Sequence, residues 1–177
     1  MKIRGFTLIE SIVVMVVLGI AMVTISSFIV PLVTRSADLH YQARAAALGQ
    51  SLMTQILARG FDHNSDFNGG ELRCGEGQSA GTPHANCSSV MGAESESPQQ
   101  FNDVDDYQGC WIPGGGNGCS DLNLLVGDSQ TSYKNFRVDI AVDYAAGFAP
   151  NSLKQINMVI HASRQQPLQF TAFRGNY

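Results

Sequence analysis

Four cysteines are the residues of this 177-residue chain best suited to covalent chemistry: Cys74, Cys87, Cys110 and Cys119. An even number of cysteines that all follow a long apolar segment favours disulfides formed in an oxidising compartment. The sequence leaves the pairing open and slightly favours nearest neighbours, Cys74 with Cys87 and Cys110 with Cys119, because this pairing closes two short loops. Zinc binding is the alternative, but neither pair has the tight spacing of structural zinc sites.

Residues 62–69 place oxygen-bearing side chains at alternate positions, as calcium-binding loops do. Asp62, Asn64 and Asp66 are the weak candidate ligands. Phe67, however, stands where an EF-hand needs glycine for its sharp turn, and Arg73 stands where it needs a bidentate glutamate. A polar turn that leaves the preceding helix is the commoner structure for such a segment. We therefore predict no metal site from it.

The other acidic and histidine residues form no recognisable catalytic motif. The acidic segment 102–106 could bind a cation weakly, although most such clusters are simply solvated. Serine, cysteine and aspartate occur in no nucleophile motif. The chain has four histidines: His40, His63, His84 and His161. Their spacing is that of neither a zinc site nor a catalytic dyad. The sequence therefore predicts neither an enzyme nor a bound cofactor.

The charge balance argues against a nucleic-acid-binding protein. The chain is mildly acidic, with 11 Lys+Arg against 15 Asp+Glu, whereas phosphate binding needs a concentrated basic surface. Only 15% of the residues are charged, compared with about 25% in a typical globular domain. Some segment is therefore expected to lie away from water.

Residues 11–34 form that segment, since they contain no charged residue and no histidine. About 20 apolar residues cross a bilayer core of about 30 Å. Lys2 and Arg4 precede the segment, so the positive-inside rule keeps the N-terminus in the cytoplasm and sends the C-terminal body outward. A cleaved signal peptide is the alternative, but the apolar run is much longer than a signal h-region and Glu10 lies at its start.

The string Gly5-Phe6-Thr7-Leu8-Ile9-Glu10 resembles the prepilin motif of type IV pilins and type II secretion pseudopilins. This resemblance implies cleavage between Gly5 and Phe6 by prepilin peptidase, then N-methylation of the new Phe6 amine. It also implies an assembly role for Glu10, whose carboxylate would pair with the Phe6 ammonium of a neighbouring subunit. An ionisable group at membrane depth costs about 2.5–3.5 kcal/mol and needs such a partner. Alternatively, Glu10 only complements the helix dipole near the headgroups.

The segments that must position these residues begin with one long helix, from Phe6 to about Arg59. Pro31 should bend it, or break it locally at residues 27–31. Its second half is amphipathic, because apolar side chains recur at steps of three and four: Tyr41, Ala45, Leu48, Leu52 and Ile56.

A glycine-rich region follows and is expected to connect the helix to a sheet without a dense core of its own. Short strands are expected in it at residues 109–112 and 122–126, with Trp111 as a packing anchor. Period-two patterns then predict three strands, at residues 136–144, 155–162 and 168–173. Their antiparallel meander has one apolar face, which the amphipathic half of the helix can cover. The fold class is therefore α+β, as in the pilin fold: a long kinked N-terminal helix on a small C-terminal antiparallel sheet.

The expected organisation has five segments. They are a cleaved leader peptide at 1–5, a transmembrane and filament-core helix at 6–34, the amphipathic half of the helix at 35–59, the Gly/Cys-rich connecting region at 60–134, and the β-meander at 135–177.

Later strings resemble the minor pilins of the mannose-sensitive haemagglutinin (MSHA) pilus: residues 61–75, residues 101–107 and the terminal FTAFRGNY, together with Ser11 after Glu10. This resemblance implies a structural subunit of an extracellular pilus used in cell adhesion. Its partners would be other major and minor pilins, prepilin peptidase and the inner-membrane assembly machinery. It would lie in the inner membrane as a single-pass protein with a periplasmic body, then in the pilus at the cell surface.

Two alternatives remain open: a minor pseudopilin of a type II secretion system, and a membrane-anchored protein that binds calcium or a glycan.

All four cysteines precede the main strands. A disulfide-bounded adhesive loop at the C-terminus, common in major pilins, therefore cannot be carried over.

Overall fold

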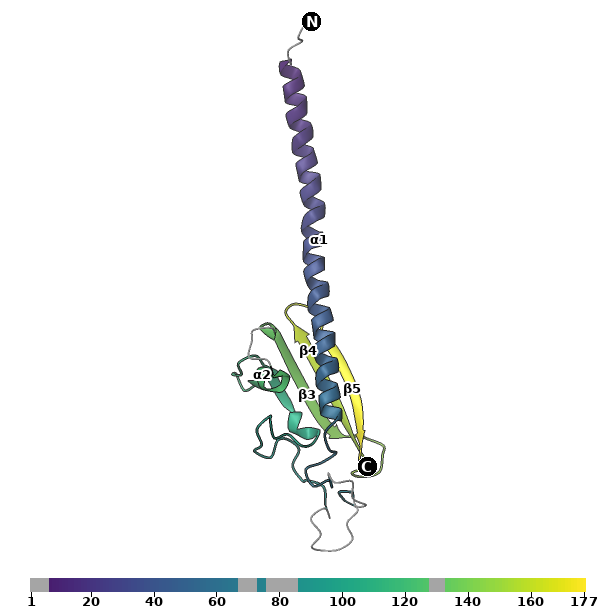
Figure 1. The fold of residues 1–177 in the computed structure, drawn as a ribbon. Helices are drawn as coiled ribbons and strands as arrows, with labels where there is room; N and C mark the ends of the chain where they lie inside the picture. The colour runs from purple at the N-terminus through teal and green to yellow at the C-terminus, as the bar shows by residue number, and fades with distance from the viewer. Residues whose placement is uncertain (1–6, 67–72, 76–85, 128–132) are drawn as a thin grey trace. The chain divides into compact units, whose positions relative to one another are not determined.

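The computed structural model describes residues 7–66, 73–75, 86–127 and 133–177. The chain forms two compact units, one ending at His40 and the other spanning Tyr41–Tyr177. Helix α1 (Leu8–Leu57) contributes its first part to the N-terminal unit and its last part to the C-terminal unit (Figure 1). A long apolar helix followed by a packed sheet is the α+β, pilin-like architecture expected from the sequence.

Helix α1 continues through Pro31. The local loss of helix expected at residues 27–31 is therefore wrong, whereas the bend stays a prediction. Proline removes one backbone donor and crowds the carbonyl one turn back. A long apolar helix can absorb this loss, because hydroxyl side chains and small local adjustments satisfy the freed groups.

The hydroxyl groups of Thr24 and Ser27 bond within α1. Thr24 Oγ1 donates to the carbonyl oxygens of Ile20 and Ala21, at 3.1 Å and 2.8 Å. Ser27 Oγ donates to the Thr24 carbonyl oxygen at 2.7 Å. These polar groups therefore place no unsatisfied hydroxyl donor on the apolar surface of the helix.

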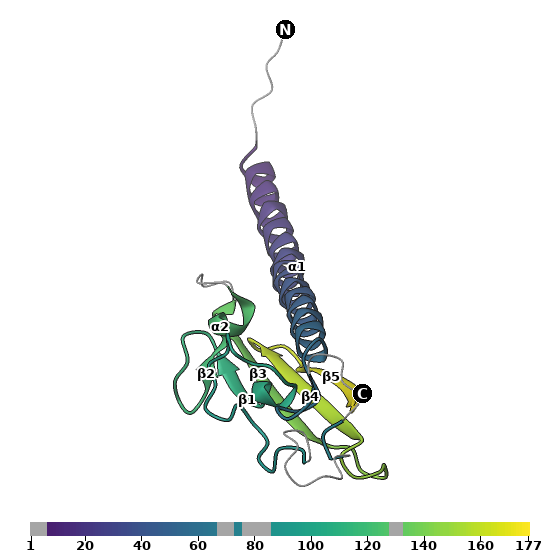
Figure 2. The same cartoon turned by 60° about the horizontal axis from the view of Figure 1, so that its bottom comes forward.

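The sheet has five strands in the order β2-β1-β3-β4-β5 (Figures 1 and 2). Strands β3 (Phe136–Tyr144), β4 (Leu153–Ala162) and β5 (Leu168–Gly175) form the predicted antiparallel meander. Strand β1 (Gly109–Ile112), also expected, adds antiparallel to β3. Strand β2 (Ser120–Asp121) then pairs parallel with β1, so the sheet is mixed rather than wholly antiparallel.

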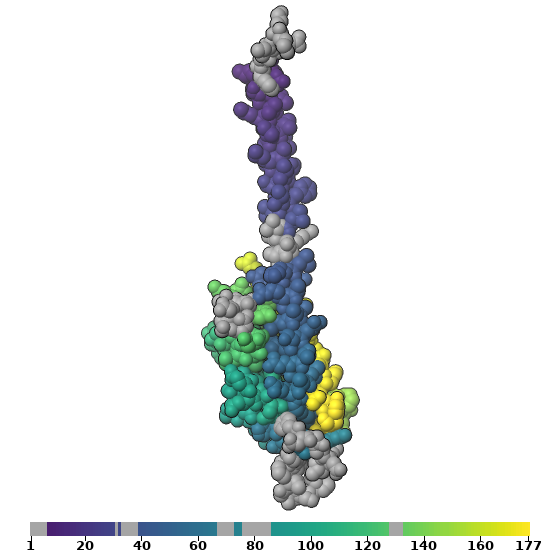
Figure 3. All heavy atoms as spheres, in the orientation of Figure 1, coloured from purple at the N-terminus to yellow at the C-terminus, as the bar shows by residue number. Residues whose placement is uncertain are grey.

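The core of the C-terminal unit lies between this sheet and the last part of α1. The predicted stripe of α1 is buried at Ala45, Leu48, Leu52 and Ile56. Alternate residues of the strands meet it, because a strand sends successive side chains to opposite faces. The buried strand residues are Val138, Ile140, Val142, Ile156, Met158 and Ile160. In Figure 3 this part of α1, in blue, lies between the green central region and the yellow strand β5.

Gly49 allows α1 to lie close to the sheet. A Cβ atom added at this position would overlap the ring of Phe170 on β5 and stand 2.9 Å from Ile160 Cδ1 on β4. Real Cβ atoms do not approach other atoms so closely. Glycine costs about 1 kcal/mol in a helix relative to alanine, and here it is needed for packing.

The connecting region contributes more to the core than the sequence indicated. It supplies the 3-10 helix η1 (Asp105–Tyr107), strands β1 and β2, and several fully buried side chains. Trp111 is 3% exposed, and its Nε1 donates to the Tyr107 carbonyl oxygen at 2.9 Å. The ring of Phe101 meets it edge-on, with centroids 6.1 Å apart. The expected role of Trp111 as a packing anchor is confirmed.

Residues 122–126 form a short helix, α2 (Leu122–Val126), so the strand expected there is wrong. The Asp121 side chain caps the helix by accepting from the Asn123 backbone N–H at 2.9 Å. Gly127 ends it in the left-handed conformation, with φ 65°. Leu122 and Leu125, three residues apart, are the buried pair. An N-cap aspartate and a C-terminal glycine bracket these five residues, and they outweigh the β propensity of an apolar run.

Two disulfides stabilise this region. Cys74 pairs with Cys87, and Cys110 on β1 pairs with Cys119 next to β2. This is the nearest-neighbour pairing that the sequence slightly favours. The second disulfide closes the loop between two parallel strands, which limits the freedom of a glycine-rich segment in the unfolded chain.

Candidate functional site

The described chain begins with a capping box at the N-terminus of α1. The Glu10 backbone N–H donates to Thr7 Oγ1 at 3.4 Å, and the Thr7 backbone N–H donates to Glu10 Oε2 at 3.5 Å. A threonine followed three residues later by a glutamate is the sequence signature of this motif, and the sequence analysis missed it. Gly5 and Phe6, the predicted cleavage and methylation residues, lie outside the described residues.

The surface of α1 that follows is largely apolar. Large side chains along Leu8–Val30 are exposed, such as Leu8 at 79% and Phe28 at 72%. By length and composition this segment can cross a membrane. A continuous apolar surface of this size is not stable in water and must be covered by lipid or by other helices. Glu10 is exposed at its start.

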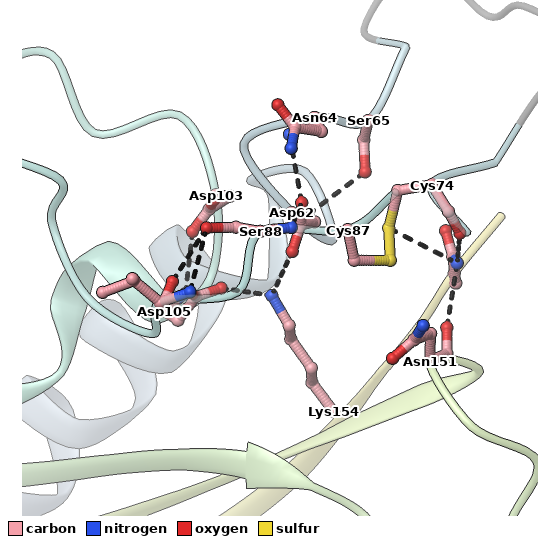
Figure 4. A network of polar contacts seen from close by, with 12 residues as sticks. Asp62, Asn64, Ser65, Cys74, Cys87, Ser88, Asp103, Asp105, Asn151 and Lys154 are labelled. Carbon is pink, nitrogen blue, oxygen red and sulfur yellow. Dashed lines mark hydrogen bonds and ion pairs between the residues drawn. A yellow bond between two sulfur atoms is a disulfide. The ribbon is translucent and has the colours of Figure 1, made fainter. Parts of the chain in front are cut away.

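The C-terminal unit contains a buried ion pair network around Lys154 of β4 (Figure 4). The Lys154 side chain is fully buried. Its ammonium donates to Asp62 Oδ2 at 3.1 Å and to Asp105 Oδ1, and it lies 4.8 Å from the centroid of the Phe61 ring. Burial acts to lower the pKa of Lys154, but the hydrogen bonds and charges of Asp105 and Asp62 outweigh it and raise this pKa.

Asp62 uses its carboxylate inside the protein rather than for an exposed calcium loop. Its Oδ1 accepts from the backbone N–H groups of Asn64, at 3.1 Å, and Ser88, at 2.8 Å, while Oδ2 faces Lys154. The Asn64 side chain donates to the Asn86 carbonyl oxygen at 3.1 Å, and Asp66 is half-buried. Asp62 and Asn64 therefore bond to different parts of the chain, and the cation beside Asp62 is the ammonium of Lys154.

The acidic segment 102–106 is not solvated, contrary to the common behaviour of such clusters. Asp103, Asp105 and Asp106 are at most 1% exposed. Asp103 Oδ1 accepts from the backbone N–H groups of Asp105 and Asp106, at 3.0 Å and 3.2 Å. Burial, with the neighbouring charges of Asp105 and Asp106, raises the pKa of Asp103 to about 8. These aspartates cap one another's backbone groups and close the turn that carries Tyr107 into the core.

Sequence reasoning missed this network, although one signal was present. Lys154 occupies the same face of the strand pattern as Ile156, Met158 and Ile160, which are buried. A lysine on the buried face of a strand requires a buried anion, and only the folded structure identifies it as Asp62 and Asp105.

The comparisons with known proteins agree with the N-terminal site. Residues 1–26 match the family model for the prokaryotic N-terminal methylation motif. In this N-terminal segment the chain thus has the methylation motif of type IV pilin-like and pseudopilin-like proteins. Proteins with this motif are processed by prepilin peptidase, are anchored in the inner membrane before assembly with other pilins, and are structural rather than enzymatic. Searches of curated proteins and of solved structures found no match.

Proposed function

We propose that this chain is a minor type IV pilin, a structural subunit that initiates or joins an MSHA-type extracellular pilus used in adhesion. The observation that carries the proposal is the exposed apolar helix Leu8–Val30, headed by the methylation motif and by Glu10. The finer assignment to a protein like the MSHA minor pilin MshD rests on the strings at residues 61–75, 101–107 and 170–177 alone.

The proposed mechanism starts from the membrane. The leader 1–5 is removed, residues 6–34 hold the subunit in the bilayer, and the assembly machinery then transfers them to the filament core. Exchanging lipid tails for apolar helices loses little burial of apolar surface, because both surroundings are hydrocarbon. Assembly is therefore selected by polar contacts.

Glu10 is the residue proposed to make this selection. The Thr7 backbone N–H donates to the Glu10 carboxylate and holds it at the helix start, where the Phe6 ammonium of a neighbouring subunit would reach it. In low-dielectric surroundings either charge alone is costly, and the pair compensates both. The C-terminal unit, with its compact sheet and two disulfides, would form the outer surface of the filament.

Mass spectrometry of the membrane-bound and pilus fractions tests the proposal. We expect the mature chain to begin at Phe6 and to carry one added methyl group. A Glu10→Gln variant should still be cleaved and methylated, but should be depleted from sheared pili. A Thr7→Val variant is the matched control, because it loses the cap hydroxyl and keeps the carboxylate, so it should enter pili. A full-length chain in mature fibres would refute the proposal, and a processed chain absent from pili would favour the secretion pseudopilin.

A further inference from the structure

Four buried side-chain oxygens in residues 96–106 accept no hydrogen bond from the described part of the chain. They are Glu96 Oε2, Asn102 Oδ1, Asp103 Oδ2 and Asp106 Oδ1. Asp103 and Asp106 are at most 1% exposed. Buried acceptors without a donor are rare in folded proteins and costly, so several of them within one short segment indicate a missing partner.

Three potential ligands converge beside these oxygens. A ring nitrogen of His63, a carboxylate oxygen of Glu94 and a carboxylate oxygen of Asp103 lie within 4.8 Å of one another. They come from the turn after α1, from the segment that begins at residue 86, and from the residues just before η1. His63 Nδ1 lies 3.1 Å from Asn102 Nδ2 and 3.6 Å from Glu96 Oε1, so polar neighbours hold this edge of the ring in place.

The charge of the surroundings favours a cation at this point. Four buried carboxylates, those of Asp62, Asp103, Asp105 and Asp106, lie in one network, and Lys154 is the buried basic residue that the structure records beside them. The contacts of this one ammonium go to Asp62 and Asp105. Among the described residues, the ion pairs of Lys154 are with Asp62 and Asp105, and no ion pair to a lysine or arginine is recorded at Asp103 or Asp106.

We propose that His63, Glu94 and Asp103 bind a divalent transition-metal ion of the Zn²⁺ type. One imidazole nitrogen with two carboxylate oxygens suits such an ion, whereas Ca²⁺ takes oxygen ligands throughout. Donors about 2 Å from a tetrahedral ion lie about 3.3 Å apart, so the exposed side chains of His63 and Glu94 must close by a small rotation. The bound ion would fasten the loop that ends in η1 to the end of α1.

A second cluster of potential ligands is excluded. Asp62 lies near the sulfur atoms of Cys74 and Cys87, but these cysteines form a disulfide and Asp62 faces Lys154. Titrations must therefore be run without reductant, since free thiols would bind zinc and hide the proposed site.

The test uses the full chain in detergent, stripped of metal with a chelator, and titrated with Zn²⁺ alone by calorimetry and thermal unfolding. We expect one bound ion per chain and a rise of several degrees in Tm. His63→Gln and Glu94→Gln should each weaken Zn²⁺ binding at least tenfold. His161→Gln is the matched control, because its side chain is 45% exposed, against 43% for His63, and it lies 3.4 Å from Asp139 on the sheet. This variant should bind as the unaltered chain does.

Replacement of Zn²⁺ by Co²⁺ gives a second readout that fold stability alone does not produce. Visible absorption of bound Co²⁺ should appear with the unaltered chain and be lost with His63→Gln. Absence of binding at millimolar Zn²⁺, equal affinity in His63→Gln and the unaltered chain, or tighter binding of Ca²⁺ than of Zn²⁺ would each overturn the proposal.

Discussion

Lys154→Met removes the buried ammonium and keeps the length and apolar bulk of the side chain. Asp62 Oδ2 and Asp105 Oδ1 then lose their cation in a region that water does not reach, since both residues are at most 1% exposed. Removing one partner of a buried ion pair costs about 3–5 kcal/mol, because it leaves an uncompensated buried charge. With two carboxylates affected, we expect a loss of free energy of unfolding toward the upper end of that range.

Denaturant unfolding of the full chain in detergent measures this loss. The fluorescence of Trp111, the one tryptophan of the chain, reports on the core next to the network. Arg137→Met is the matched control, because it removes an exposed ion pair with Asp139, with the Arg137 side chain 55% exposed. This control should change the unfolding midpoint little.

Neutralising the two carboxylates as well separates the effect of the unpaired charges on stability from the effect of altered packing. Adding Asp62→Asn and Asp105→Asn to Lys154→Met should recover much of the lost stability, because buried neutral amides cost less than buried unpaired carboxylates. If Lys154→Met unfolds at the same denaturant concentration as Arg137→Met, the network contributes nothing and the reasoning fails.

Three further predictions concern the same unit. Without metal, the free energy of unfolding should fall as pH rises from about 4 toward about 8, because the raised pKa of Asp103 makes the folded state hold a proton that the unfolded state releases. Urea unfolding midpoints measured across this pH range should show the decrease. The same pH slope in Asp103→Asn would contradict this prediction. Gly49→Ala should lose about 1–3 kcal/mol through overpacking against Phe170, despite the better helix propensity of alanine; an equal or higher Tm would show that the ring moves aside freely. Millimolar Ca²⁺ should leave the Tm unchanged, since Asp62 is already paired with Lys154; a clear rise in Tm would restore the calcium loop.

The elements that the sequence predicted correctly are those with a long, regular pattern. The stripe from Ala45 to Ile56 and the alternation in residues 136–144 report burial directly, because each apolar side chain recurs at the period of its own element. The methylation motif is likewise local, which is why it could be recognised within ten residues.

The features that the sequence did not reveal depend on partners far along the chain. An aspartate in a polar loop is normally exposed, so only the approach of Lys154, which follows Asp62 by 92 residues and Asp105 by 49, explains their burial. Gly49 gave no local signal of its contact with Phe170 for the same reason. Helix α2 was missed for another reason: its cap residues, Asp121 and Gly127, are a local signal that the sequence analysis did not consider beside the apolar run between them.

The sequence distance between Lys154 and its two anions also sets an order of maturation. Asp62 and Asp105 are synthesised before the strand that carries their counter-ion. Until β4 arrives, burying them would strand both charges, so the middle of the chain has to stay hydrated while the disulfides between near neighbours can already form. We therefore expect the C-terminal unit to fold fully only after its last strands are complete. A truncated chain that lacks β4 should be cleaved by proteases more readily.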